Sequence, residues 1–118
     1  AQMLKVRGTT FYPATVFDVL NGMPEVSEYY VEVADADEPG ADRIRVHAAL
    51  APDTPALRRQ LEERLLARLR VRPELSVEGE DEIRRQVYRP QSRKPVRFID
   101  RRRRAAVASY PEETAACR

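Results

Sequence analysis

The stretch VSEYYVEVADADEPGADRIRVHAAL, residues 26–50, holds the pattern that decides the fold. On both sides of its centre apolar side chains occupy alternate positions, at Tyr29, Val31, Val33, Ile44, Val46 and Ala48. Such alternation is typical of strands with one face on a core and the other toward solvent. The intervening segment, DADEPGAD, is rich in residues that favour turns. We therefore predict an antiparallel hairpin with strands over 26–36 and 42–50.

A strong helix signal follows this hairpin. Thr54 is suited to the N-cap and Pro55 to the first helical position. Leucines then recur every four positions, at 57, 61, 65 and 69, as in an amphipathic helix packed on a sheet. Pro73 is expected to break that helix. Downstream, the sequence predicts a short strand over 75–77, a short helix within 80–88 and a last strand within 95–100.

The segment before the hairpin supplies one more strand and one more helix. MLKVRG, residues 3–8, has strand character and ends at a glycine, and Pro13 opens a short helix that stops at Asn21-Gly22. The resulting order predicts an α+β fold, a ferredoxin-like split β-α-β-β-α-β sandwich with a C-terminal extension. Residues 105–118 show no periodicity, which indicates a flexible tail.

Composition narrows the possible functions. The 118 residues suit one domain, and 21 basic against 19 acidic residues leave a net charge of only +2, which argues against nucleic acid as a partner. Without an apolar run near the roughly 20 residues that a bilayer requires, we expect a cytoplasmic protein with no membrane contact. Cys117 is the single cysteine and His47 the single histidine, so we predict no metal site.

Motifs near both ends of the chain match those of one family in order and spacing. The first set is Met3, Leu4, Arg7-Gly8, Tyr12-Pro13 and Pro24-Glu25-Val26. The second set is Pro90, Ser92, Lys94, Arg97, Phe98-Ile99, Asp100 and Arg101. Over residues 2 to about 102 the chain resembles the C-terminal domain of phenylacetate-coenzyme A ligase-like enzymes, in the AMP-forming (adenylate-forming) acyl-CoA synthetase superfamily.

The resemblance implies a lid domain, residues 1–104, that rotates on a hinge against an N-terminal adenylation domain outside this chain. That partner would bind ATP with Mg²⁺ and an aryl or other small carboxylic acid. Lys94 would be catalytic, because an ammonium group on a flexible stem can stabilise anions as they meet during acyl-adenylate formation. The Lys5 to Gly8 stretch, Arg7 included, would then serve thioester formation with coenzyme A, since glycine permits close backbone approach.

Two departures and two alternatives accompany this interpretation. Arg93 stands where the family usually has glycine, adding a second cation for cosubstrates, and Gln2 replaces the usual acidic hinge residue. The chain alone is expected to be inactive.

The alternatives are a free-standing ferredoxin-like module that binds small molecules or proteins, and a nucleic-acid binder that uses the arginines at 101–104. The acid substrate and the oligomeric state, a homodimer included, stay open.

Overall fold

A computed structural model describes residues 3–6, 8–37 and 41–102. Its helices and strands are, in chain order, β1 (Leu4–Val6), β2 (Thr9–Phe11), α1 (Pro13–Asn21), β3 (Val26–Asp35), β4 (Asp42–Leu50), α2 (Pro55–Leu69), β5 (Glu74–Val77), α3 (Glu80–Val87) and β6 (Phe98–Asp100). The α+β class and the split strand-helix order are confirmed. The tail predicted for 105–118 lies outside the described residues.

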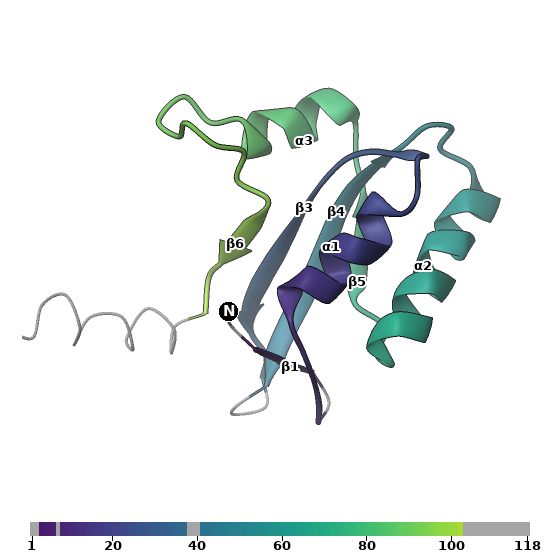
Figure 1. Ribbon diagram of the computed structural model, residues 1–118, viewed down its shortest axis with the longest axis vertical. Coiled ribbons are helices and arrows are strands. Elements are labelled where there is room, and N and C mark those ends of the chain that lie inside the picture. Colours follow the sequence, from purple (N-terminus) through teal and green to yellow (C-terminus); the bar gives the residue numbers. More distant parts are fainter. Residues whose placement is uncertain (1–2, 7, 38–40, 103–118) are drawn as a thin grey trace, which may run out of the picture.

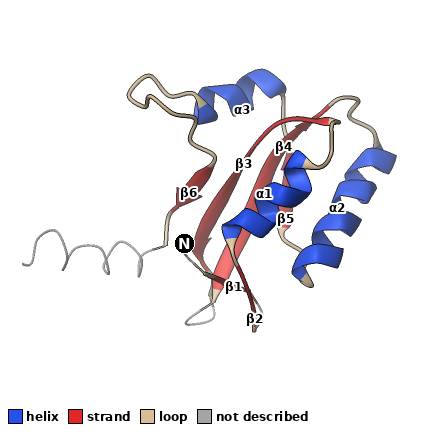
Figure 2. Ribbon diagram, in the orientation of Figure 1, coloured by secondary structure: helices blue, strands red, loops and turns tan. Residues whose placement is uncertain are grey.

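A four-stranded mixed sheet with the order β5-β4-β3-β6 forms the centre of the domain (Figure 2). The predicted hairpin is present, since β3 and β4 pair antiparallel with Val31 opposite Val46. β5 runs parallel to β4, and β6 runs parallel to β3. Both short C-terminal strands therefore extend the hairpin, one at each edge.

The main core lies between one face of this sheet and the helices α1 and α2 (Figure 1). The predicted inward positions of β3 and β4 are all buried there, together with the four leucines of α2 at 57, 61, 65 and 69. Helix α2 begins as expected, because the Thr54 hydroxyl accepts a hydrogen bond from the Leu57 amide at 3.1 Å. It ends at Leu69, before Pro73, with Arg70 in the left-handed region at φ 64°.

The other face of the sheet is only partly open to solvent. Ile83 and Val87 of α3 are fully buried against Tyr30 and Ala49, in a second and smaller core. Tyr29 and Tyr30 thus point to opposite faces, as strand geometry requires. His47 is also buried on this face, stacked on the Tyr30 ring and flanked by Glu32 and Glu78, whereas the alternation in the hairpin predicts a position toward solvent.

The first strand lies outside the main sheet. β1 pairs antiparallel with β2 as a small hairpin, with Leu4 opposite Phe11 and Val6 opposite Thr9. The sequence had indicated the strand but not its partner. The physical reason is that β5 and β6 already occupy both edges of the central hairpin, which leaves β1 to pair with the adjacent β-branched and aromatic segment.

Candidate functional site

The segment 88–97, between α3 and β6, carries Lys94 and is called the lysine loop below. Lys94 and its neighbour Arg93 are both exposed. Among the described residues neither side chain makes a hydrogen bond or an ion pair. An unpaired, hydrated ammonium group of this kind is available to an anion carried by another body.

An open hollow of about 590 Å³ adjoins the lysine loop. Its lining consists of Phe17, Ser92, Lys94, Pro95, Val96, Arg97 and Phe98. Most of these groups are apolar, and the cations come from Lys94 and Arg97. The surface around Lys94 is therefore suited to contact with a partly apolar, partly anionic surface.

Both ends of the lysine loop are bonded to the body of the domain. The Val96 amide donates to the Val87 carbonyl at 2.8 Å, and the Val31 amide of β3 donates to the Arg97 carbonyl at 2.7 Å. Nearer the tip, the Ser92 hydroxyl donates to the Lys94 carbonyl at 2.7 Å. The base of the loop is thus held on the sheet while its lysine projects outward.

The second candidate segment is the β1-β2 hairpin, which holds Lys5 and Gly8. Gly8 adopts φ +80°, a conformation that favours glycine, and no heavy atom lies within 4 Å of the place where a Cβ would stand. The space beside this backbone is therefore open to an approaching molecule. Lys5 is exposed, and Arg7 lies outside the described residues.

A buried ion-pair network fastens this hairpin to the sheet, and is called the Arg102 anchor. The Arg102 guanidinium donates to both carboxylate oxygens of Asp100, at 2.9 and 2.7 Å, and to Asp42 at 3.4 Å. It also donates to the Met3 carbonyl at 3.3 Å, while the Lys5 amide donates to Asp42 at 2.7 Å. The side chains of Arg102 and Asp42 are only 7% and 1% exposed.

The two candidate segments lie at different ends of the domain. In Figure 1 the lysine loop follows α3 at the top, whereas β1 lies at the bottom. The strand pairing agrees, because the lysine loop enters β6 opposite Val31, in the middle of β3. Lys5 instead bonds to Asp42, which lies opposite Asp35, the last residue of β3. The structure therefore brings Lys94 together with Arg93 and not with Lys5 or Gly8.

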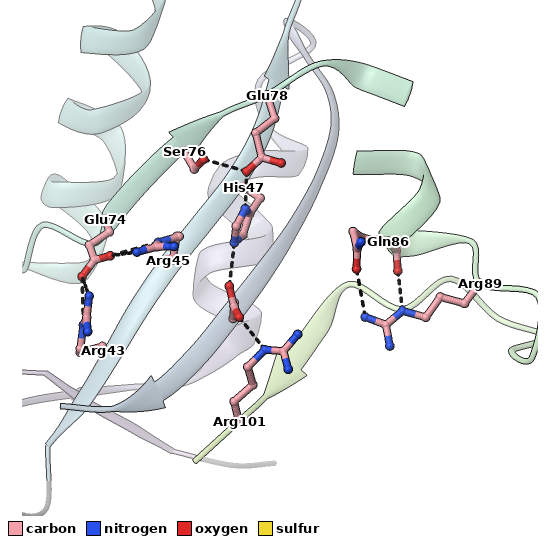
Figure 3. A network of polar contacts seen from close by, with 10 residues as sticks. Arg43, Arg45, His47, Glu74, Ser76, Glu78, Gln86, Arg89 and Arg101 are labelled. Atoms are coloured by element: carbon pink, nitrogen blue, oxygen red, sulfur yellow. Dashed lines mark hydrogen bonds and ion pairs between the residues drawn. The ribbon is translucent and has the colours of Figure 1, made fainter. Parts of the chain in front are cut away.

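A second polar network covers the open face of the sheet (Figure 3). The His47 ring lies between two carboxylates, with Nδ1 at 2.5 Å from Glu78 and Nε2 at 2.9 Å from Glu32. We call these three residues the carboxylate–imidazole cluster. Each ring nitrogen of His47 therefore lies within hydrogen-bonding distance of a carboxylate oxygen. The ring also stacks on Tyr30, with centroids 4.2 Å apart.

The environment of this cluster lowers the pKa of both carboxyl groups. Burial raises the pKa of Glu32, but hydrogen bonds from His47 and Arg101 outweigh it, and the net pKa lies below its ordinary value of 4.5. Burial likewise raises the pKa of Glu78, and hydrogen bonds from His47 and Ser76 bring it below the ordinary value. The cluster is thus a fully paired structural network. In the described part of the chain, no group of acidic, histidine and cysteine side chains could hold a metal ion.

The arginine run at the end of the domain is only partly visible, since residues 103 and 104 lie outside the described ranges. Arg101 donates to Glu32, and Arg102 forms the anchor described above. Both cations are therefore compensated by carboxylates of the same domain, which weakens the nucleic-acid interpretation. No helix within the described residues is long and apolar enough to cross a membrane.

Fold and site together define a small α+β domain that presents an exposed lysine loop at one end and a glycine hairpin at the other. The chain belongs to the family of AMP-binding enzyme C-terminal domains, which matches residues 8–102. This confirms the resemblance indicated by the motifs at the two ends of the chain. No curated protein matches the sequence at a significant level.

Solved structures of CoA ligases share the fold. A 2-hydroxyisobutyryl-CoA ligase in complex with 2-HIB-AMP and CoA, in the thioesterification state, is 20% identical with a TM-score of 0.68; the match covers 96% of this chain and 24% of that one. The same ligase in the postadenylation state gives 22% identity, a TM-score of 0.61 and the same coverage. A domain of phenylacetate-coenzyme A ligase from Bacteroides vulgatus is 22% identical with a TM-score of 0.61, over 86% of this chain and 94% of that one.

Proposed function

We propose that this chain is the mobile C-terminal domain of an AMP-forming acid–CoA ligase, acting in the cytoplasm on an aryl acid such as phenylacetate. The chain spans 24% of the 2-hydroxyisobutyryl-CoA ligase that it resembles, so its activity requires an N-terminal adenylation domain that holds ATP, Mg²⁺ and the acid. The observation that carries the proposal is the unpaired, exposed ammonium of Lys94 on a loop anchored at its base.

In the first half-reaction a carboxylate oxygen bonds to the α-phosphorus of ATP, and pyrophosphate leaves. Negative charge concentrates where the two anions meet, and Lys94 places a cation there, with Arg93 beside it. Lys94 is suited to this because its charge is not already neutralised within the domain. The ammonium stabilises charge without having to transfer a proton.

In the second half-reaction the sulfur of coenzyme A bonds to the acyl carbon, and AMP leaves. The β1-β2 hairpin is the segment proposed for this step, because Gly8 offers an open backbone surface and Lys5 an exposed cation. Since the hairpin and the lysine loop lie at different ends of the domain, they take turns at one site only if the domain rotates.

The test for Lys94 is to measure both half-reactions separately in the complete ligase. Lys94→Ala is expected to slow acyl-adenylate formation by about 10²-fold, the cost of removing one preorganised charge stabiliser, and to leave thioester formation from supplied acyl-adenylate unchanged. Arg59→Ala, which removes an exposed cation of α2, an element that belongs to neither segment, is the matched control and should alter neither step. Equal losses in both steps for Lys94→Ala would refute the assigned role.

The test for the hairpin uses two substitutions at Gly8. Gly8→Asn adds a side chain but tolerates positive φ, whereas Gly8→Ala strains the turn. If coenzyme A or the partner domain approaches this backbone closely, both variants slow thioester formation selectively. If only the turn conformation matters, Gly8→Asn behaves like the unmodified protein, and the close approach is ruled out.

A further inference from the structure

Glu28 is a buried carboxylate at the beginning of β3, beside an irregularity in the pairing of β3 with β4. Its side chain is 8% exposed, and each of its oxygens accepts a hydrogen bond from a different arginine. Oε2 accepts from Arg84 at 3.1 Å, and Oε1 accepts from Arg97 at 2.9 Å. A buried carboxylate needs such partners, since burial of an unpaired charge is costly.

The two arginines stand on either side of the lysine loop in the sequence. Arg84 lies in the last turn of α3, before the loop, and Arg97 is the last residue of the loop, before β6. Glu28 therefore joins the two ends of the loop through one side chain. We call this arrangement the Glu28 clamp.

Aromatic contacts reinforce the clamp. The Arg84 guanidinium lies over the Tyr88 ring at 5.1 Å, and that of Arg97 lies over the Tyr29 ring at 4.9 Å. Arg97 also donates to the Tyr88 hydroxyl at 3.1 Å and to the Tyr29 carbonyl at 3.0 Å. Tyr88 begins the lysine loop, so the planar guanidinium of Arg97 binds the first residue of the loop as well as the sheet.

We propose that Glu28 is a positioning residue that sets the direction of the lysine loop, and hence the place that Lys94 reaches in the adenylating pose. This inference rests on the function proposed for Lys94. Between the tied ends, the bonds seen in the loop are local ones, such as that between Ser92 and the Lys94 carbonyl. Its orientation on the domain is therefore determined at its base, where Glu28 holds both sides.

Catalysis is sensitive to this orientation because charge stabilisation depends on where the cation stands. A displacement of about 1 Å can reduce the rate by about 10²-fold even when the mutated residue is far from the reacting atoms. Without the carboxylate, the guanidinium groups of Arg84 and Arg97 become neighbouring like charges, which repel. The expected result is a loop that samples several directions and whose remaining backbone hydrogen bonds open more often.

The variant that tests the clamp is Glu28→Gln in the complete ligase. Glutamine offers one acceptor oxygen and turns an amide donor toward the second arginine, so only half of the clamp survives. We expect acyl-adenylate formation to slow by about 10-fold, a smaller loss than for Lys94→Ala, because the lysine is displaced but not removed. Thioester formation from supplied acyl-adenylate should keep its rate, since the hairpin end of the domain is untouched.

Glu74→Gln is the matched control. Glu74 also accepts hydrogen bonds from two arginines, Arg43 and Arg45, but in β5, at the edge of the sheet opposite β6 and the lysine loop. It should alter neither half-reaction. Hydrogen exchange of segment 88–97 gives a second readout, because the Val96 amide, bonded to Val87, should exchange faster in Glu28→Gln and not in Glu74→Gln.

A milder variant covers the case in which Glu28→Gln does not fold. Arg84→Gln removes only the more exposed arginine of the clamp, whose side chain is 51% exposed. It should slow acyl-adenylate formation selectively, but less than Glu28→Gln does. Equal losses in both half-reactions, or unchanged adenylation with unchanged exchange, would overturn the clamp. If Glu28→Gln leaves adenylation intact while Lys94→Ala still impairs it, the clamp is refuted and the function proposed for Lys94 stands. If Lys94→Ala has no selective effect, both the proposed function and the clamp are refuted.

Discussion

Replacing Arg102 with methionine tests how strongly the Arg102 anchor stabilises the domain. Methionine fills a similar volume without charge, and it leaves Asp42 and Asp100 without their guanidinium partner. Removing one partner of a buried ion pair typically costs about 3–5 kcal/mol. Asp42 keeps the bond from the Lys5 amide and Asp100 is 17% exposed, so we expect the lower end, ~3 kcal/mol.

The assay is urea unfolding at neutral pH, followed by circular dichroism. A loss of ~3 kcal/mol corresponds to a fall in the melting temperature of about 10–15 °C for a domain of this size. Arg101→Met is the control from the adjacent position, because Arg101 is 57% exposed in its pair with Glu32. An exposed ion pair typically contributes under about 1 kcal/mol, so Arg102→Met should lower the free energy of unfolding clearly more than Arg101→Met does.

The double variant Arg102→Met/Asp42→Asn separates the unpaired charge from lost packing. If the Asp42 charge, deprived of the guanidinium, causes much of the loss of stability, neutralising that charge restores part of it. The reasoning is refuted if Arg102→Met costs less than about 1 kcal/mol, or if it matches Arg101→Met. It is also refuted if Asp42→Asn lowers stability as much in the Arg102→Met background as it does alone. Such additivity would mean that the two residues act independently.

Three further outcomes are expected from the same unfolding assay. His47→Gln should lower stability by ~2 kcal/mol near neutral pH, because it leaves the two carboxylates of the cluster without their shared donor. The pKa values of Glu32 and Glu78 are depressed in the folded state, so these carboxylates stabilise the fold above their ordinary pKa of 4.5 and lose this effect as the pH falls below it. The difference in stability between His47→Gln and the unmodified protein should therefore shrink below pH 4.5. Leu61→Ala should cost about 2–5 kcal/mol, and the partly exposed Leu66→Ala distinctly less. Thr54→Ala should cost about 1 kcal/mol through the lost helix cap.

The agreement between sequence and structure is closest where a pattern is local. The alternation in β3 and β4 placed the correct side chains in the core, and the leucines of α2 recur at the spacing of a helix face. Thr54 and Pro55 marked the helix start because capping depends on neighbours three residues away. The family resemblance singled out Lys94 for a role toward a separate domain; this role stays a prediction, and the structure shows that the lysine is exposed.

The candidate site was only half visible in the sequence. Lys94 and Gly8 were named in advance, whereas Glu28 was not, although a charged residue beside the inward positions of a buried strand is a weak signal of a paired carboxylate. The exposure of His47 was mispredicted for a similar reason. Alternation shows that the His47 side chain points away from the main core, but not that Tyr30, Glu32 and Glu78 surround it there.

The sequence by itself determined the helices, the strands other than β2, the faces buried in the main core and the family motifs at either end, because these depend on residues a few positions apart. Only the tertiary structure decided that β1 pairs with β2 outside the sheet, that Glu28 meets arginines 56 and 69 positions away, and that Arg102 reaches Asp42 across 60 positions. Such contacts follow from strand order and register, and these are set by competition among all the strands for two sheet edges, which no local pattern encodes.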